Sequence, residues 1–285
     1  MNKKQNIPLY NVIIFVLFLA FSERCFSQED DTQKLNYRSN LFGIGKINVY
    51  DTYLSPLNYT GTSLSFMQEN MKMTGLGDGN IAVQQLFNIE FSSSENATGN
   101  ATNYTGFMEY SYGLFYRFTP LPELKIFAGS QADGLIGFIY NTRNGNNPAT
   151  AKAHLNLTLS AATSYNFKVK SQPLRVRYQI SSPFAGIMFS PHYGQSYYEI
   201  SLGNDDHLAN FSSYHNQIIL RNNFSLEIPL SFMTLRLMYI NSVYETRIYN
   251  IETRIHNNSF MIGFTREFFN VSGKKPVKGN YNHVF

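Results

Sequence analysis

The chain has 285 residues, a formal net charge of +4 and one cysteine. The charge is close to balance and no basic stripe is visible, which excludes a nucleic-acid-binding protein. A single cysteine excludes a disulfide within the chain and a multi-thiolate metal site.

The N-terminus has the pattern of a secretory signal peptide. Lys3 and Lys4 precede an apolar run of ten residues, 12–21, and Cys25 and Ser27 supply the small residues of a cleavage site. A membrane-spanning helix needs about 20 apolar residues, and the charged residues before Cys25 disfavour a lipoprotein. We therefore expect residues 1–27 to be removed by cleavage after Ser27, followed by a periplasmic lead-in at 28–40.

Long strands with a period of two dominate the rest of the chain. From Leu155 to Val169 apolar and polar residues alternate almost without interruption, which indicates a strand with one apolar and one polar face. Strands of soluble proteins usually stop at about five or six residues, whereas about 9–11 tilted residues cross a bilayer. The sequence predicts ten such strands, at 41–50, 62–73, 80–91, 104–118, 124–140, 155–169, 174–188, 215–228, 232–249 and 254–270.

The connections alternate in length. Short turns at 75–79, 120–122, 170–173 and 229–231 alternate with longer polar stretches at 51–61, 92–103, 141–151 and 189–214. Periplasmic turns and extracellular loops of outer-membrane barrels differ in this way, so both termini are expected in the periplasm. Within the longest loop, residues 197–202 are expected to form a hairpin on the outer face, and the alternative of a spanning hairpin raises the strand count to twelve.

These features predict an all-β fold, a transmembrane antiparallel up-and-down β-barrel over residues 41–270, with a C-terminal tail at 271–285. The predicted location is the cell outer membrane, with membrane lipid as the surrounding partner. The alternative is a soluble secreted β-sandwich that acts as a binding module.

Strand parity predicts which side chains face the lumen. In the first strand the face with Leu41, Ile47 and Val49 is expected to be apolar, and a bulge near Phe66 is expected to restore the phase of the second strand. The charged residues assigned to the lumen are Glu90, Glu109, Arg117, Lys168, Arg175, Arg177, Arg221 and Glu227, and His154 is expected to form hydrogen bonds there. The mixed signs favour a packed, salt-bridged interior over a narrow solute path, with Glu227 paired to Arg175 or Arg177.

Three segments carry a family resemblance, namely Gly45–Gly61, Ser190–Gln195 and Gly263–Phe269. Together they resemble a family of uncharacterised outer-membrane β-barrel proteins of the Bacteroidetes. The resemblance implies a barrel in the outer membrane, which is inserted by barrel-assembly machinery, and it implies no reaction or ligand.

No catalytic, cofactor-binding or metal-binding residues are assigned, and no cofactor is expected. His192, Asp205, Asp206, His207 and His215 lie in or beside the longest loop, and they are the candidates for the alternative function, an outer-membrane hydrolase with an extracellular site. Neighbouring residues in a loop point apart, and no metal-ligand spacing or nucleophile elbow occurs. The sequence therefore favours a structural or surface-interaction role, with or without a narrow pore, over an enzyme.

Overall fold

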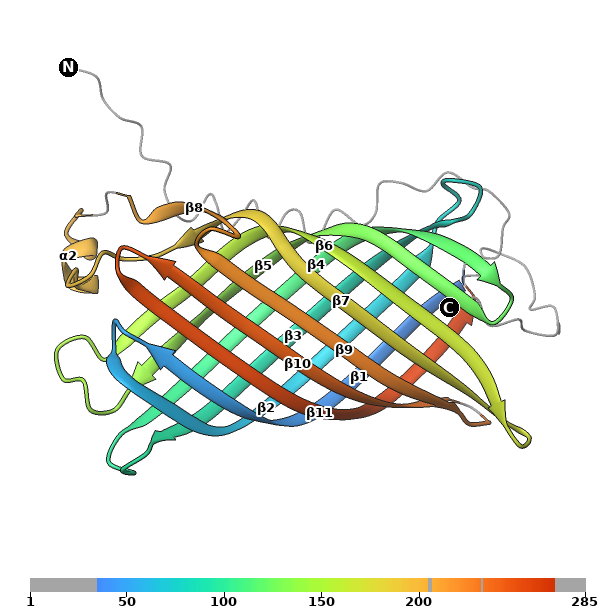
Figure 1. The fold of residues 1–285 in the computed structure, drawn as a ribbon, viewed down its shortest axis with the longest axis horizontal. Coiled ribbons are helices and arrows are strands. Elements are labelled where there is room, and N and C mark those ends of the chain that lie inside the picture. The colour runs from blue at the N-terminus through green and yellow to red at the C-terminus, as the bar shows by residue number, and fades with distance from the viewer. Residues whose placement is uncertain (1–34, 205–206, 232, 270–285) are drawn as a thin grey trace, which may run out of the picture. The chain divides into compact units, whose positions relative to one another are not determined.

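Ten long strands form a closed antiparallel barrel in the computed structural model, which describes residues 35–204, 207–231 and 233–269 (Figure 1). The strands of the ring are β1 (Leu35–Asp51), β2 (Ser55–Met73), β3 (Ile81–Asn96), β4 (Thr102–Leu121), β5 (Leu124–Asn141), β6 (Ala149–Val169), β7 (Gln172–Phe189), β9 (Gln217–Pro229), β10 (Thr234–Ile248) and β11 (Ile251–Phe269). Each strand pairs with its neighbour, and β1 pairs with β11 over its whole length. The predicted fold class and the count of ten are confirmed, whereas the two-layer β-sandwich and the twelve-strand barrel are wrong.

The register around the ring fixes the tilt of the strands. From Lys46, pairing through β2 and β3 leads to Tyr104 of β4, and pairing the other way through β11, β10, β9, β7, β6 and β5 leads to Tyr116 of β4. The two end points lie twelve residues apart on one strand (positions 104 and 116), and this offset is the shear of the barrel. A shear larger than the strand number inclines every strand steeply, as Figure 1 shows.

A belt of exposed apolar side chains surrounds the barrel. On β6, Leu155, Leu157 and Leu159 project outward, while Asn156 and Thr158 between them are buried in the lumen. On β4 the outward set runs from Tyr104 to Phe118 and is aromatic at both ends. An apolar belt that tyrosines flank is the surface that a lipid bilayer covers in barrels of this kind. No helix of the described chain has the length and apolarity to cross a membrane.

Two predicted faces are wrong. On β1, Leu41, Ile47 and Val49 are buried inside the barrel, and Phe42 and Ile44 face outward with 65% and 59% exposure. On β2 the register runs through Phe66 without a shift, so no bulge occurs there and Met67 points into the lumen. The interior of the barrel is partly apolar, so an apolar face of β1 or β2 does not by itself identify the side that faces lipid.

The end of the barrel opposite the start of β1 and the end of β11, which we call the loop end, has shorter connections than expected. Residues 52–54 alone join β1 to β2, because both strands extend into the polar stretch predicted as a loop. Tyr249 and Asn250 join β10 to β11 with φ of 49° and 64°. Positive φ at both central residues is the mark of a type I′ turn, whose twist matches that of paired strands.

The connection between β7 and β9 is the longest and departs from the predicted hairpin. Residues 197–202 do not form a strand; they contain a short helix, α2 (Tyr197–Ser201), which Ser196 and Glu199 cap reciprocally. It is followed by β8 (Ala209–Ser213), which pairs with the end of β7 over Ala185–Phe189. β9 pairs with β7 only over Arg175–Ser181, and the register of β6 with β7 shifts close by, at Pro183. Proline donates no ladder hydrogen bond, so this is the place where the wall changes partner.

The predicted boundaries are extended at the start of the barrel. β1 begins at Leu35 and pairs there with Phe269, so six residues assigned to the periplasmic lead-in belong to the wall. The predicted signal peptide, its cleavage after Ser27 and the tail at 271–285 lie outside the described residues.

Substitution of an outward leucine tests the assignment of the faces. Leu157→Arg places a charge on the apolar belt, and it should reduce the free energy of folding into phospholipid vesicles by about 2–4 kcal/mol. The control is Leu202→Arg on the loop-end connection, where the side chain is exposed beside α2 and the change should be near zero. Equal losses in a urea titration of the two variants would contradict the assigned faces.

Candidate functional site

The lumen is filled toward the end at which β1 begins and β11 ends, which we call the terminal end. Tyr37 from β1, Glu69 from β2, Arg177 from β7, Glu227 from β9 and Arg236 from β10 form a buried charged layer there. The five side chains come from strands on opposite sides of the ring, so together they bridge the lumen.

Glu69 holds one side of this layer together. Its carboxylate accepts from Arg236 Nη1 at 2.5 Å and from Arg177 Nη2 at 3.3 Å. Gln84 Nε2 donates to the same carboxylate at 2.6 Å. A buried carboxylate with three donors is well satisfied, which is the condition under which a charge is tolerated in an interior.

Glu227 holds the other side. Its oxygens lie 3.1 Å from Arg175 Nη1, 3.7 Å from Arg177 Nη1 and 3.6 Å from Arg236 Nε, and it also accepts the hydroxyl hydrogen of Tyr37. The guanidinium of Arg177 stacks over the Tyr37 ring at 4.8 Å from its centroid, a favourable cation–π position. The predicted pairing of Glu227 with Arg175 or Arg177 is confirmed.

The layer is close to electrically neutral. Arg175 also pairs with Glu267 at 2.9 Å, so the network contains three arginines and three glutamates. An apolar shell of Met71, Met73, Ala82, Phe115 and Phe127 packs around Tyr37. Beyond the layer, a vestibule of about 510 Å³ opens at the terminal end and is lined by Arg175, Glu227 and Glu267 among others.

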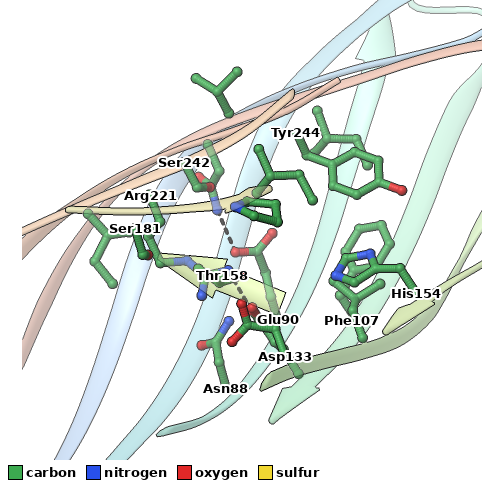
Figure 2. A pocket seen from close by; sticks show the side chains of 18 of the residues that line it. Asn88, Glu90, Phe107, Asp133, His154, Thr158, Ser181, Arg221, Ser242 and Tyr244 are labelled. Atoms are coloured by element: carbon green, nitrogen blue, oxygen red, sulfur yellow. Dashed lines mark hydrogen bonds and ion pairs between the residues drawn. The ribbon is translucent and has the colours of Figure 1, made fainter. Parts of the chain in front are cut away.

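A smaller cavity of about 90 Å³ lies on the loop-end side of the charged layer (Figure 2). Three carboxylates line it, from Glu90, Glu109 and Asp133, together with Arg221 and the ring of His154. Figure 2 shows Glu90, Asp133, His154 and Arg221 extending into this cavity from several strands of the wall. The cavity has an excess of carboxylates over cationic side chains, so it favours water and cationic or hydrogen-bond-donating groups.

Each carboxylate of the cavity has a partner in the wall. Arg221 Nη2 lies 2.5 Å from Glu109, Asn257 Nδ2 donates to Glu90 at 2.6 Å, and Gln131 Nε2 donates to Asp133 at 2.8 Å. His154 stacks on Tyr244 with 5.9 Å between ring centroids, and its Nδ1 has no hydrogen-bond partner among the described residues. No group of three or more histidine, cysteine or acidic side chains in the described part is arranged to hold a metal ion.

An apolar layer closes the loop end of the lumen. It consists of Ile47, Val49, Leu54, Tyr59, Ala101, Ile139 and Ile255. Beside it, Lys152 Nζ and Asp51 form a buried ion pair at 2.6 Å, and Thr253 donates to the same carboxylate. The acidic cavity is therefore enclosed between a charged layer and an apolar layer.

Six of the eight charged lumen candidates lie in the charged layer or line the smaller cavity, and the other two lie at the terminal end of the barrel. Arg117 bonds Gly79 and Asn80 at the β2–β3 turn, and Lys168, exposed at the end of β6, lines the vestibule. Sequence reasoning missed Glu69, because apolar residues on both faces of β2 gave no clear parity and a bulge near Phe66 was expected. It also missed Tyr37, in the residues assigned to the lead-in.

The loop candidates that the structure describes do not assemble a catalytic site, although His192 and His207 both contact Tyr249. His192 stacks on Tyr249 at 3.9 Å, and the backbone oxygen of His207 accepts from Tyr249 and Asn210. Asp205 and Asp206 lie outside the described residues. His215 Nδ1 lies 2.6 Å from Ser213 Oγ, but no described carboxylate bonds this histidine, so the third group of a catalytic triad is missing from the described part.

Removal of the Glu227 charge tests the role of the charged layer. Glu227→Gln leaves the facing arginines undercompensated in a buried place, and it should reduce the free energy of unfolding by about 3–5 kcal/mol. The matched control is Glu252→Gln, which removes an exposed pair with Arg254 and should cost about 0–1 kcal/mol. Urea titration in vesicles measures both, and a loss for Glu227→Gln no greater than the control would refute a tightly paired layer.

Solved barrels of outer-membrane proteins resemble this structure only distantly. The transport unit of the autotransporter AIDA-I from Escherichia coli has 9% identity and a TM-score of 0.48, with 94% of this chain and 100% of that chain covered. The outer membrane protease OmpT from Escherichia coli has 8% identity and a TM-score of 0.46, with 86% and 99% covered. These values say nothing about the activity of this chain.

The sequence itself identifies a family. No curated protein matches the chain, and the Bacteroidetes origin that the resemblance implies is not supported by any comparison. The family described as protein of unknown function (DUF3316) matches residues 10–275. Because this match covers nearly the whole sequence and the complete described barrel, the chain belongs to the DUF3316 family.

Proposed function

We propose that this protein is a non-conducting outer-membrane barrel that anchors a surface segment, the β7–β9 connection, for interaction outside the cell. The observation that carries the proposal is the buried charged layer, in which Glu69 of β2 binds Arg177 from the opposite wall of the lumen and Glu227 binds arginines of the two strands beside it. A ten-stranded barrel is only slightly wider than an eight-stranded one, whose interior side chains fill it. The charged layer and the apolar layer therefore block a solute path twice.

The surface-interaction part of the proposal rests on the β7–β9 connection. The side chains of Tyr193, Tyr198 and Leu202 are about 70% exposed there. Tyr198 lies in α2, and Leu202 is the C-cap residue of the same helix. Exposed aromatic side chains at loop tips are enriched at protein interfaces. An anchor needs no catalytic group, and no described carboxylate bonds His192, His207 or His215.

Conductance separates a plugged barrel from a narrow pore. Wild-type protein in planar lipid bilayers should give no stepwise ionic current, because both layers exclude water from the axis, while a general porin in the same setup gives steps. Glu227→Gln should also remain silent. Stable current steps in the wild type, with an ion selectivity that Glu227→Gln shifts, would overturn the proposal in favour of a pore.

The orientation follows from the position of the long connection. We expect the loop end to face the outside, so that a peptide tag inserted at Asn146, between β5 and β6, is labelled by antibody on intact cells. A tag at Gly77, in the β2–β3 turn at the terminal end, should be labelled only after permeabilisation. Labelling of the Gly77 tag on intact cells contradicts this orientation.

A further inference from the structure

A row of polar side chains lies on the outer surface, across four neighbouring strands. Lys46 of β1 is paired with Asn258 of β11, which is paired with Asn241 of β10 and then with Asn222 of β9. These residues have the outward parity of Phe260 and Phe224, two positions along their strands, which are both exposed. The row therefore faces the surroundings of the barrel rather than its lumen.

Hydrogen bonds connect the asparagines of this outer polar row. Asn222 Nδ2 donates to Asn241 at 3.2 Å, and Asn241 Nδ2 donates to Asn258 at 2.9 Å. The hydroxyl of Tyr178 donates to Asn222 at 2.8 Å, and the hydroxyl of Tyr239 donates to Asn258 at 2.9 Å. Lys46, at the end of the row, has no partner among the described residues.

The pairing register places this row at the middle of the apolar belt. From Lys46, the paired positions lead across three strands to Tyr104 of β4. From Asn222, in the other direction, they lead across four strands to Tyr116 of the same strand. Tyr104 lies at one end of the apolar face of β4 and Tyr116 lies near the other end, before Phe118, so the tilt carries the row across most of the belt. The four polar residues occupy the central steps, where lipid chains would surround them.

Lipid chains are an unfavourable environment for these polar side chains. A lysine on the lipid face of a barrel is most costly at the membrane midplane, and spare amide donors find no acceptor in hydrocarbon. The opposite side of the barrel differs, because the exposed side chains of β4 and β6 there are mainly tyrosines and leucines. One wall suits lipid and the other suits a polar protein surface.

We propose that a second copy of this chain covers the outer polar row and forms a two-fold symmetric dimer in the membrane, with β11 at the axis. Two copies inserted in the same direction can be related only by a two-fold axis along the membrane normal. Such an axis through β11 brings Asn258 against Asn258 of the second copy. Asparagine both donates and accepts, so the two side chains can bond each other when Asn258 Oδ1 exchanges one of the two donors that it has within the chain, Tyr239 or Asn241.

The charges beside β11 complement each other under the same symmetry. Lys46 lies on β1 and Glu245 on β10, the two neighbours of β11. The two-fold axis exchanges these sides at equal depth. The tilt places Lys46 nearer the loop end than Asn241, and Glu245 lies four positions from Asn241 in the same direction, at positions 245 and 241, so each Lys46 comes close to Glu245 of the other copy. Among the described residues of its own chain Glu245 bonds only His256, at 2.8 Å, and it keeps acceptor capacity for a lysine. The dimer thus contains the same charge pair twice.

Cysteine crosslinking tests the position of the axis. In a Cys25→Ser background, Asn258→Cys in vesicles should oxidise to a disulfide-linked dimer, because each new thiol meets its symmetry mate. The control Leu157→Cys lies on the lipid-facing wall and should remain monomeric at the same protein-to-lipid ratio. Equal crosslinking of the two variants indicates random collision and overturns the proposal, as does the absence of a dimer for Asn258→Cys.

Charge exchange tests the contact itself. In the Asn258→Cys background, Lys46→Glu or Glu245→Lys alone places like charges together, and each should lower the dimer yield about tenfold, equivalent to about 1.4 kcal/mol. The combination of both changes should restore the yield. Heat-modifiable gel mobility verifies that every variant is folded. Single variants that dimerise as well as the parent, or a combination that does not recover, overturn the assigned contact.

Discussion

The closed hydrogen-bonded ring is the constraint on which every other feature of this structure depends. A bilayer offers no partner for an unpaired backbone group, so a sheet can cross it only when its first and last strands meet. The pairing of β1 with β11 along their whole length meets this condition. Once the ring is closed, its shear fixes the tilt, and the tilt decides which side chains meet in the lumen and which lie at one depth outside.

The lumen is filled by charged side chains near one end and by apolar side chains near the other. Near the terminal end arginines and glutamates neutralise each other, and near the loop end aliphatic and aromatic side chains pack as in a soluble core. Buried ion pairs contribute little net stability compared with apolar packing, but the loss of one partner is costly. The charged layer therefore specifies which strands face each other more than it stabilises the barrel. The acidic cavity remains between the two layers.

The outer surface is asymmetric for a related reason. β4 and β6 present an apolar wall that suits lipid chains, whereas the wall around β11 presents hydrogen-bonding groups at mid-depth. The same parity that hides charges in the lumen leaves these asparagines outside. A polar residue of a membrane-spanning strand therefore lies either in the lumen or on the outer surface, and its neighbours across the sheet show which of the two faces it occupies.

The sequence by itself determined the class of fold and the strands, because a period of two over Leu155–Val169 and similar segments is a local property of the chain. It also predicted the pairing of Glu227 with Arg175 or Arg177, since these positions have clear parity. It did not determine the faces of β1 and β2, where Leu41 and Met67 are buried within the lumen. Alternation tells two faces apart without saying which is inside, and when the interior is partly apolar, composition does not decide it. Only the register around the closed ring brought Glu69 to Arg236 and placed Lys46 and Asn258 side by side, because these contacts join residues that are far apart in the sequence.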